Sequence, residues 1–210
     1  MNEAQASPDP ILLDPGGPIR EDPLRAFERW LLMARDVVGF AASAMSLATA
    51  TPDGMPDVRI VLLQSVREGG LVFFTNLDSA KGSQMLANPR AAACFHWPAI
   101  GKQVRVRGSV TQVDAPFADL YFGGRSRGSQ IGAHASPQSS PIADRTTLLD
   151  RVREVEERFA GRSIPRPEHW TGMVLAPLEI EFREDGTDRL HDRILFRRSA
   201  TEWSATRLAP

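Results

Sequence analysis

Residues 44–76 read AMSLATATPDGMPDVRIVLLQSVREGGLVFFTN, and this stretch decides the fold class. It contains three short apolar runs, separated by the turn-forming segments TPDG and REGG. Short runs rich in Val, Ile and Phe, bounded by Gly, Pro and Asp, are typical of strands joined by tight turns. The stretch therefore predicts three antiparallel strands, at residues 44–50, 58–64 and 71–76, that form a meander.

Further strands are predicted downstream. Residues 91–97 form the apolar run AAACFHW, and residues 102–113 read KQVRVRGSVTQV, in which valines alternate with Gln103, Arg105 and Arg107. An alternation with a period of two predicts a strand with one buried and one polar face. Residues 173–210 predict more strands, joined by turns at EDG and SATE.

Helices are predicted around these strands. Asp22 and Pro23 suit the cap and first turn of a helix whose apolar residues recur at helical spacing as far as Val38. Shorter helices are expected near residues 79–89 and after Asp114, and a longer one at 142–159, whereas the Gly- and Ser-rich residues 123–141 predict a loop. Many short strands with peripheral helices favour an α+β fold built on an antiparallel barrel.

Composition limits the function. A chain of 210 residues with 42% hydrophobic residues suits one domain or a tight pair, and we expect a single domain over 21–210 after an extended or disordered arm at 1–20. The net charge of −1 gives no bulk attraction to nucleic acid or to acidic membranes. The single cysteine, Cys94, and the lack of a signal-like or membrane-spanning run predict a cytoplasmic protein.

The sequence carries none of the strong short motifs of metal, nucleophile or nucleotide chemistry. The four histidines are far apart, and neither a Gly-x-Ser-x-Gly elbow nor a Gly-rich phosphate loop is present, so we expect no metal site. Arg, Lys, Ser, Thr and Gln instead gather at strand ends and loops, and these are natural phosphate ligands.

The stretch RLHDR, residues 189–193, carries three basic side chains. In a strand, Arg189, His191 and Arg193 would share one face. They would then form either a solvated strand edge or part of a site for an anion.

Taken in order, the segments DPLRAFERWL, RIVLLQ, FFTN, RGSQIGAHASPQSS, PRPEHW, RLHDR and the terminal RLAP resemble the pyridoxamine/pyridoxine 5′-phosphate oxidase family over nearly the whole chain. The resemblance implies an FMN-dependent split β-barrel homodimer with two active sites at the subunit interface. It also implies hydride transfer from the substrate carbon bearing the amine or alcohol to the flavin, which oxygen reoxidises with formation of hydrogen peroxide. The flavin would carry the difficult chemistry.

The resemblance also implies roles for individual residues. FMN would be contacted by Arg59, Ile60, Val61, Leu62, Leu63, Gln64, Phe74, Thr75, Lys81, Gln103, Gln138, Ser139, Arg183 and Arg193. The substrate would be contacted by Gln64, Tyr121, Arg125, Ser129, Arg189 and His191. Arg189 and His191 are the catalytic candidates, because they would lie over the substrate ring to orient it and to handle a proton.

Four positions depart from the residues usual in that family. Gln64 stands in place of a lysine, Ala80 of an arginine, Arg183 of a tryptophan and Phe74 of a tyrosine. The neutral amide of Gln64 cannot supply the positive charge of a lysine. Arg183, in turn, is able to donate to a flavin phosphate or to the substrate.

Three hypotheses follow from these departures. The first is a vitamin B6 oxidase with a weakened hold on the substrate phosphate. The second is a related oxidase that acts on a different cyclic amine or alcohol, as the phenazine-biosynthesis oxidases do. The third is a carrier or sensor that binds flavin or pyridoxal 5′-phosphate without consuming oxygen.

Overall fold

The computed structural model of the chain describes residues 22–200 and 202–210, so the arm predicted at 1–20 lies outside the described residues. Strands form the largest class of secondary structure in this part of the chain. They are β1 (Ala44–Ala50), β2 (Pro56–Leu62), β3 (Ser65–Arg67), β4 (Gly70–Asn76), β5 (Arg90–Trp97), β6 (Lys102–Gln112), β7 (Trp170–Glu184), β8 (Asp192–Arg198) and β9 (Trp203–Leu208). The helices are α1 (Pro23–Val38), α2 (Ala80–Ala87), α3 (Ala115–Gly123), α4 (Arg127–Ala135) and α5 (Arg145–Arg158), with short 3₁₀ turns η1 (Gly39–Ser43), η2 (Pro98–Ile100) and η3 (Thr187–Arg189).

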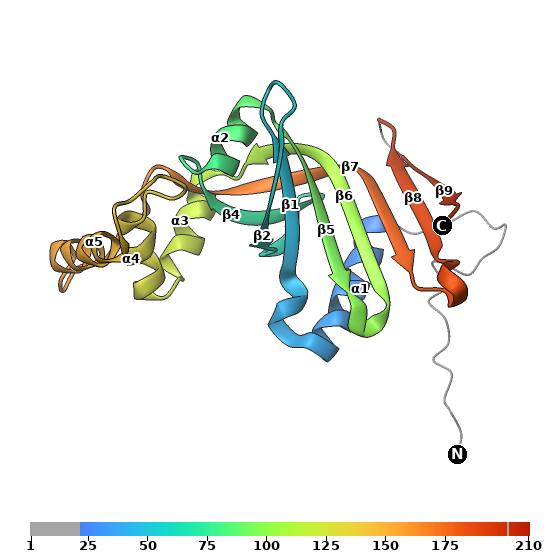
Figure 1. Cartoon of the computed structure of the whole chain (residues 1–210), viewed down its shortest axis with the longest axis horizontal. Coiled ribbons are helices and arrows are strands. Elements are labelled where there is room, and N and C mark those ends of the chain that lie inside the picture. The colour runs from blue at the N-terminus through green and yellow to red at the C-terminus, as the bar shows by residue number, and fades with distance from the viewer. Residues whose placement is uncertain (1–21, 201) are drawn as a thin grey trace, which may run out of the picture.

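All strands belong to one antiparallel sheet, in the order β2-β1-β5-β6-β7-β4-β3, with β8 and β9 continuing from β7. The sheet curls because β7 is 15 residues long and pairs with β4 over its first half and with β8 over its second half. Figure 1 shows β8 and β9 at one end of the molecule and α3, α4 and α5 at the other. These features confirm the predicted α+β fold with an antiparallel split barrel.

A bulge bends the sheet where β6 meets β7. The register shifts between Arg107 and Gly108, and Leu178 on β7 is left without a partner on β6. A Cβ at Gly108 would lie 1.9 Å from the carbonyl oxygen of Ala176, so the two backbones approach too closely for any other residue. Bulges of this kind increase the local twist of a strand pair and so promote barrel closure.

The predicted meander of three strands was wrong in its pairing. β1 does pair with β2, but β4 pairs with β3 and β7, at the other end of the sheet. The barrel is left open between β2 and β3, where the backbone N–H of Gln64 donates to the carbonyl of Val72 across 2.8 Å. Long-range pairing with β7, more than 90 residues downstream, outweighed the local hairpin.

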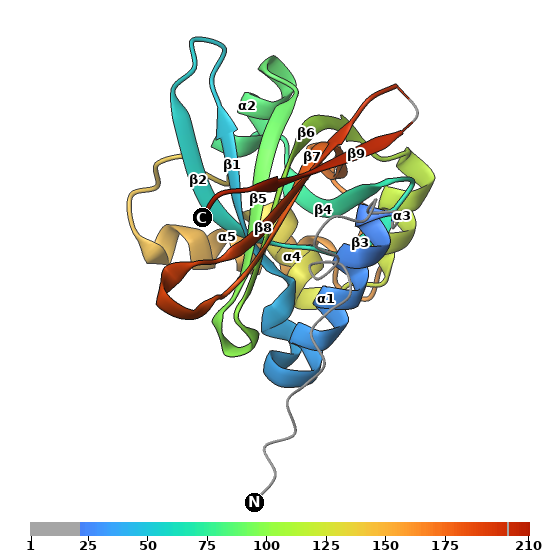
Figure 2. The same ribbon diagram turned by 90° about the vertical axis from the view of Figure 1, so that its right-hand side faces the viewer.

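The main core lies between α1 and the concave face of the sheet (Figure 2). As predicted, Asp22 caps α1, and its carboxylate accepts from the N–H of Leu24 at 2.9 Å. Phe27 and Trp30 are fully buried, and the Trp30 ring meets Phe182 of β7 edge-on at 5.0 Å. The predicted alternation in β6 is also confirmed, because Val104 and Val106 face this core whereas Arg105 and Arg107 are exposed.

A second, smaller core joins α3, α4, α5 and the start of β7. The prediction of a loop over residues 123–141 was wrong, because α4 occupies Arg127–Ala135. Ser126 caps it, and Ile131 and Ala135, one turn apart, are buried. The helix was missed because Gly128 and Gly132 disfavour a helix on propensity, whereas burial of its apolar side stabilises it.

Two further boundaries differ from the expected ones. The helix expected at 142–159 begins at Arg145, because the Asp144 side chain accepts from the N–H of Thr147 at 2.7 Å and so caps it there. RLHDR is not one strand: Arg189 ends η3 with a φ of 63°, and β8 begins only at Asp192. No helix in the described part of the chain is long and apolar enough to cross a membrane.

Candidate functional site

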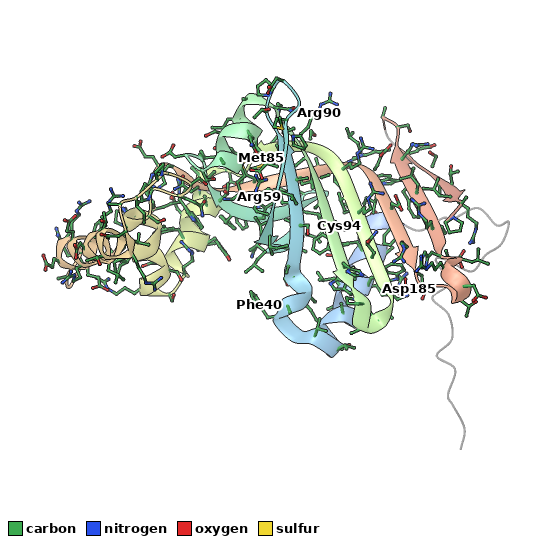
Figure 3. The ribbon with its side chains drawn as sticks, viewed as in Figure 1. Phe40, Arg59, Met85, Arg90, Cys94 and Asp185 are labelled. Carbon is green, nitrogen blue, oxygen red and sulfur yellow. The ribbon has the colours of Figure 1, made fainter. Side chains whose placement is uncertain are left out.

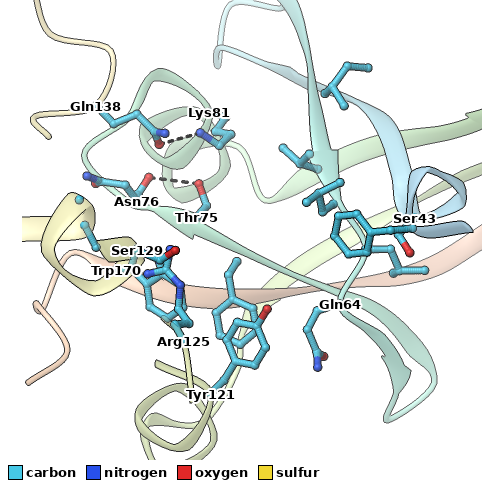
Figure 4. Close-up of a pocket in the computed structure, with 18 of the residues that line it drawn as sticks. Ser43, Gln64, Thr75, Asn76, Lys81, Tyr121, Arg125, Ser129, Gln138 and Trp170 are labelled. Atoms are coloured by element: carbon cyan, nitrogen blue, oxygen red, sulfur yellow. Dashed lines mark hydrogen bonds between the residues drawn. The ribbon is translucent and has the colours of Figure 1, made fainter. Parts of the chain in front are cut away.

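A cavity of about 870 Å³ lies where the split barrel is open (Figure 4). The end of β2, β4 and the first turn of α2 form one side of it, and α3, α4 and the start of β7 form the other. Cavities of this size are typical of sites for small molecules and cofactors. Its lining includes Arg35, Gly39, Phe40, Ser43, Ile60, Val61, Leu62, Leu63, Gln64, Phe74, Thr75, Asn76, Lys81, Tyr121, Arg125, Ser129, Gly132, Ala133, Ser136, Gln138 and Trp170.

Three stacked aromatic rings form one wall of the cavity. Phe74 lies between Tyr121, at a centroid distance of 3.9 Å, and Trp170, at 4.8 Å, with all three rings nearly parallel. The guanidinium of Arg125 lies 4.6 Å from the centroid of Trp170. Phe74 therefore occupies a tightly packed position, with one aromatic ring stacked on each face of its own ring.

Arg125 carries a buried hydrogen-bond donor that no described residue accepts from. Its Nη1 is a buried side-chain nitrogen without a hydrogen-bond partner among the described residues. Burial lowers the pKa of Arg125 from its ordinary value, although a guanidinium stays charged near neutral pH. An unpaired buried donor is costly, so Arg125, with Ser129 beside it (Figure 4) and Tyr121 in the same lining, forms a site at which an anionic group would restore the missing bond.

A second cation lies at the other side of the cavity. Lys81 is 9% exposed, and its Nζ donates to Gln138 Oε1 at 2.9 Å and to Ser79 Oγ at 3.2 Å. Burial, and then the charge of nearby Arg59, lowers the pKa of Lys81. Among the described residues, no carboxylate lines the cavity beside this ammonium, which makes it a second position suited to a phosphate.

The described lining residues are positively charged as a set. They include Arg35, Lys81 and Arg125 but neither an aspartate nor a glutamate. Arg35 comes from the last turn of α1, and its Nη2 donates to Ser43 Oγ at 3.1 Å. Sequence reasoning missed Arg35 because it lies outside the segments that carried the resemblance.

Sequence reasoning placed many lining residues correctly and missed others. The predicted residues that line the cavity are Ile60, Val61, Leu62, Leu63, Gln64, Phe74, Thr75, Lys81, Tyr121, Arg125, Ser129 and Gln138. Besides Arg35, it missed Ser43, Asn76, Ser136 and Trp170 as contributors to the cavity. Trp170 lies in PRPEHW, a segment that carried the resemblance, so the sequence did contain a signal for it.

The remaining predicted residues do not line this cavity. Arg59 points toward α2 and the β1 backbone, donating to Asp57, Gln84, Thr49 Oγ1 and the carbonyl of Leu47. The others are Gln103, Ser139, Arg183, Arg189, His191 and Arg193.

Most of these remaining residues lie together. Gln103, Arg183 and Arg193 are register partners on the adjacent strands β6, β7 and β8, and His191 contacts Arg183. We call Gln103, Arg183, Arg189, His191 and Arg193 the C-terminal cluster. In Figure 3, Asp185, which lies two residues after Arg183, is far from Arg59. Within one copy of the chain, the predicted site residues thus form two separate groups.

Histidine, cysteine and carboxylate side chains are not gathered into a metal site in the described part of the chain. His134 Nε2 lies 2.8 Å from the carbonyl of Pro165, and His169 Nε2 lies 3.1 Å from that of Ala133. Both histidines therefore tie the α4 region to the segment before β7.

Comparison with known proteins identifies the family that the chain matches. The family described as pyridoxamine 5′-phosphate oxidase matches residues 35–159, and the pyridoxine 5′-phosphate oxidase C-terminal dimerisation region matches residues 170–210. The chain is 48% identical to a pyridoxine/pyridoxamine 5′-phosphate oxidase of Sphingopyxis alaskensis, over 90% of this chain and 88% of that protein. It is 49% identical to the protein of the same name from Hyphomonas neptunium, over 92% and 89% of the two chains.

A solved structure agrees with the fold. PhzG from Burkholderia lata, in complex with tetrahydrophenazine-1-carboxylic acid, matches 96% of this chain and 97% of its own, with a TM-score of 0.86 and 30% sequence identity. The first match contains every lining residue of the cavity except Trp170, and the dimerisation match spans β7 to β9 and includes most of the C-terminal cluster. The chain belongs to the pyridoxine/pyridoxamine 5′-phosphate oxidase family.

Proposed function

We propose that this protein is an FMN-dependent oxidase that converts pyridoxine 5′-phosphate or pyridoxamine 5′-phosphate to pyridoxal 5′-phosphate and reduces oxygen to hydrogen peroxide. The observation that carries the proposal is the unpaired Nη1 of Arg125, in a cavity lined by three cationic side chains and, among the described residues, no carboxylate. The names of the similar proteins support the same activity. We further propose that residues 21–210 act as a single domain and work in the cytoplasm.

The donors on the Lys81 side fit the phosphate of FMN. Lys81 would bind it as a charge-assisted donor, with Gln138 fixing the position of the ammonium, and Thr75 is a further hydroxyl on the same side. The largely apolar segment Ile60–Leu63 offers a surface for the flavin ring. When bound, FMN supplies the hydride acceptor that oxygen then restores.

The donors on the Arg125 side fit the substrate phosphate. Arg125 would use its unpaired Nη1, and Ser129 and Tyr121 would each add a hydroxyl. A hydrogen bond to a charged group contributes about 1.5–3 kcal/mol, so this contact would account for one to two decades of affinity, roughly. Arg35, bonded to Ser43 beside the Gln64 segment, would add positive charge on the side where Gln64 has none.

We propose that a second copy of the chain completes each site. The C-terminal cluster lies outside the cavity of its own copy, and β7 to β9 fall within the region matched by the dimerisation family. In a homodimer, this cluster would face the partner's cavity, with Gln103 and Arg193 toward FMN and Arg189 and His191 toward the substrate ring. Holding the donor carbon against the flavin in this way can lower the activation free energy of hydride transfer by several kcal/mol.

Mixing two inactive variants tests the shared site. Arg125→Ala removes a cavity residue and Arg189→Ala a residue of the C-terminal cluster. If each site combines both copies, hybrid dimers formed by unfolding and refolding the mixture carry one intact site and regain activity. A mixture that stays as inactive as the separate variants, although hybrid dimers form, would show that each copy builds its own site.

Steady-state turnover tests the reaction itself. The FMN-loaded protein should form pyridoxal 5′-phosphate and peroxide in equal amounts from either phosphorylated substrate, whereas pyridoxamine without its phosphate should require a far higher concentration. Equal KM values for pyridoxamine and its phosphate would contradict the assigned role of Arg125. Binding without any oxygen uptake would identify a carrier or sensor instead.

A second candidate function rests on Gln64. This neutral residue lies in the cavity wall at a position where the family usually has a lysine, and PhzG, at 30% identity, was solved with a ring carboxylic acid. An oxidase for a cyclic substrate with a carboxylate would need less positive charge than one for a phosphate. Turnover of a tetrahydrophenazine carboxylic acid with a higher kcat/KM than pyridoxamine 5′-phosphate would favour this function.

A further inference from the structure

Arg183, Asp185 and His191 form a compact polar cluster where β7 ends and β8 begins. Nη2 of Arg183 contacts two groups at once: His191 Nε2 at 2.9 Å and Asp185 Oδ1 at 2.8 Å. The same Asp185 oxygen lies 3.5 Å from His191 Nδ1. The side chains of Arg183 and His191 are only 22% and 23% exposed, so both are largely shielded from water even in one copy of the chain.

These contacts determine which ring nitrogen of His191 carries the proton. A guanidinium has donors only, so Nε2 must accept from Arg183 and cannot itself be protonated. A neutral imidazole then carries its proton on Nδ1, which faces the acceptor Asp185. The N–H of Gly186 also points at Nδ1 from 3.4 Å, but the ring has a single lone pair for both, and the shorter contact to Arg183 takes it.

Arg183 and His191 lie on either side of a strained turn, residues 184–190. Asp188 and Arg189 both have positive φ values, 53° and 63°, which side chains other than glycine adopt at a cost. Gly186 has no room for a side chain, because a Cβ there would lie 2.0 Å from the carbonyl oxygen of Leu190. The bond between Arg183 and His191 joins the two ends of this turn and so holds the backbone that carries Arg189.

We propose that Arg183 is a positioning residue that fixes His191 as the neutral Nδ1–H tautomer and holds Arg189 in place. The inference rests on the proposed function, in which Arg189 and His191 lie over the substrate ring. The tautomer bears on the two roles predicted for His191, which are to orient the substrate and to handle a proton. With Nε2 occupied by Arg183, His191 orients the substrate and donates no proton from that nitrogen.

Nitrogen NMR of the FMN-loaded protein, with ¹⁵N in its histidines, tests the tautomer directly. His191→Gln identifies the His191 signals among those of the four histidines. The expected spectrum has a protonated Nδ1 and an unprotonated Nε2, and Arg183→Leu should shift the population toward the Nε2–H form that free imidazoles favour. A wild-type Nε2 that carries a proton, or a spectrum unchanged in Arg183→Leu, would overturn the proposal.

Kinetics of the same variants separate positioning from cofactor binding. Arg183→Leu should slow flavin reduction about tenfold or more while the Kd for FMN stays within about twofold, because orientation rather than affinity is lost. Arg183→Lys should recover part of the rate, since an ammonium also donates to Nε2. Arg197→Leu, which removes an arginine paired with Glu179 on the same sheet face, is the matched control and should change neither quantity.

Two outcomes distinguish failures of this inference from failures of the proposed function. A large rise in the Kd for FMN with an unchanged tautomer would identify Arg183 as a cofactor ligand and overturn the positioning role. If the phosphorylated pyridines fail to reduce the flavin, the proposed function is wrong, but the NMR result still supports or overturns the tautomer by itself.

Discussion

The ammonium of Lys81 donates to the side-chain oxygen of Gln138 across 2.9 Å, joining α2 to the segment that follows α4. The bond places a buried cation at the edge of the cavity, whose lining contains no carboxylate in the part of the chain that the structure describes. Its lowered pKa means that Lys81 loses its proton at a lower pH than an ordinary lysine, whose value is 10.5.

The first prediction follows from this pKa. FMN affinity should be constant while Lys81 is protonated and should fall as the pH rises through its lowered pKa, because the phosphate then loses a charge-assisted bond. Loss of that bond would weaken binding by about tenfold to a hundredfold. Flavin fluorescence titrations at a series of pH values from neutrality up to 10.5, the ordinary lysine pKa, measure the change.

Lys81→Arg is the control for this prediction. An arginine keeps its charge over the whole range, so the variant should bind FMN with little dependence on pH. If wild type and Lys81→Arg lose affinity in parallel as the pH rises, another group is responsible and Lys81 does not bind the phosphate.

The second prediction concerns Arg125. Arg125→Gln should raise the KM for pyridoxamine 5′-phosphate by about tenfold to a hundredfold, because a neutral amide replaces the guanidinium that faces the phosphate. The KM for unphosphorylated pyridoxamine should change little. Steady-state kinetics with both substrates give the two ratios, and equal effects on both would mean that Arg125 acts through packing against Trp170 rather than through charge.

The third prediction compares Gln64 and Arg35, two further positions in the cavity lining. Gln64→Lys should lower the KM for the phosphorylated substrate, and Arg35→Gln should raise it, each by about tenfold, since each changes one charge near the same anion. Arg25→Gln, an exposed position on α1, is the control and should leave kinetics unchanged. Opposite signs in Gln64→Lys and Arg35→Gln support a shared electrostatic role, whereas an effect in neither would place the phosphate elsewhere.

The fourth prediction tests the bulge that curls the sheet. Gly108→Ala should destabilise the protein by about 1–3 kcal/mol, because its Cβ would meet the Ala176 carbonyl and the backbone would have to move. Gly128→Ala, in α4 with open space around its Cα, should instead stabilise by about 0.5–1 kcal/mol. Urea unfolding at equal protein concentrations measures both, and a neutral Gly108→Ala would show that the close approach is relaxed in solution.

Local patterns predicted the parts of the fold that depend on local chemistry. The cap at Asp22 and the alternation in β6 were readable because each depends on neighbouring residues. The position of β4 was not, because its partner β7 lies far along the chain and pairing at that distance leaves no local signature. α4 was hidden for a related reason, since burial of Ile131 and Ala135 outweighs the low helix propensity of its glycines.

The site divides in the same way. Residues within the quoted motifs, such as Thr75, Ser129 and Gln138, could be assigned to the cavity region by resemblance. The place of Arg35 in the cavity and the bond between Arg183 and His191 could not be predicted from the sequence. Both depend on which distant or substituted side chains meet in space. These contacts in space are where the structure adds most to the sequence.

Anaerobic mixing tests the central claim most directly. The FMN-saturated protein is freed of oxygen and mixed with pyridoxamine 5′-phosphate or pyridoxine 5′-phosphate, while the absorbance of the oxidised flavin is followed. The account predicts that the flavin bleaches and that pyridoxal 5′-phosphate forms in an amount equal to the flavin reduced. A flavin that binds but stays oxidised with both compounds would contradict it.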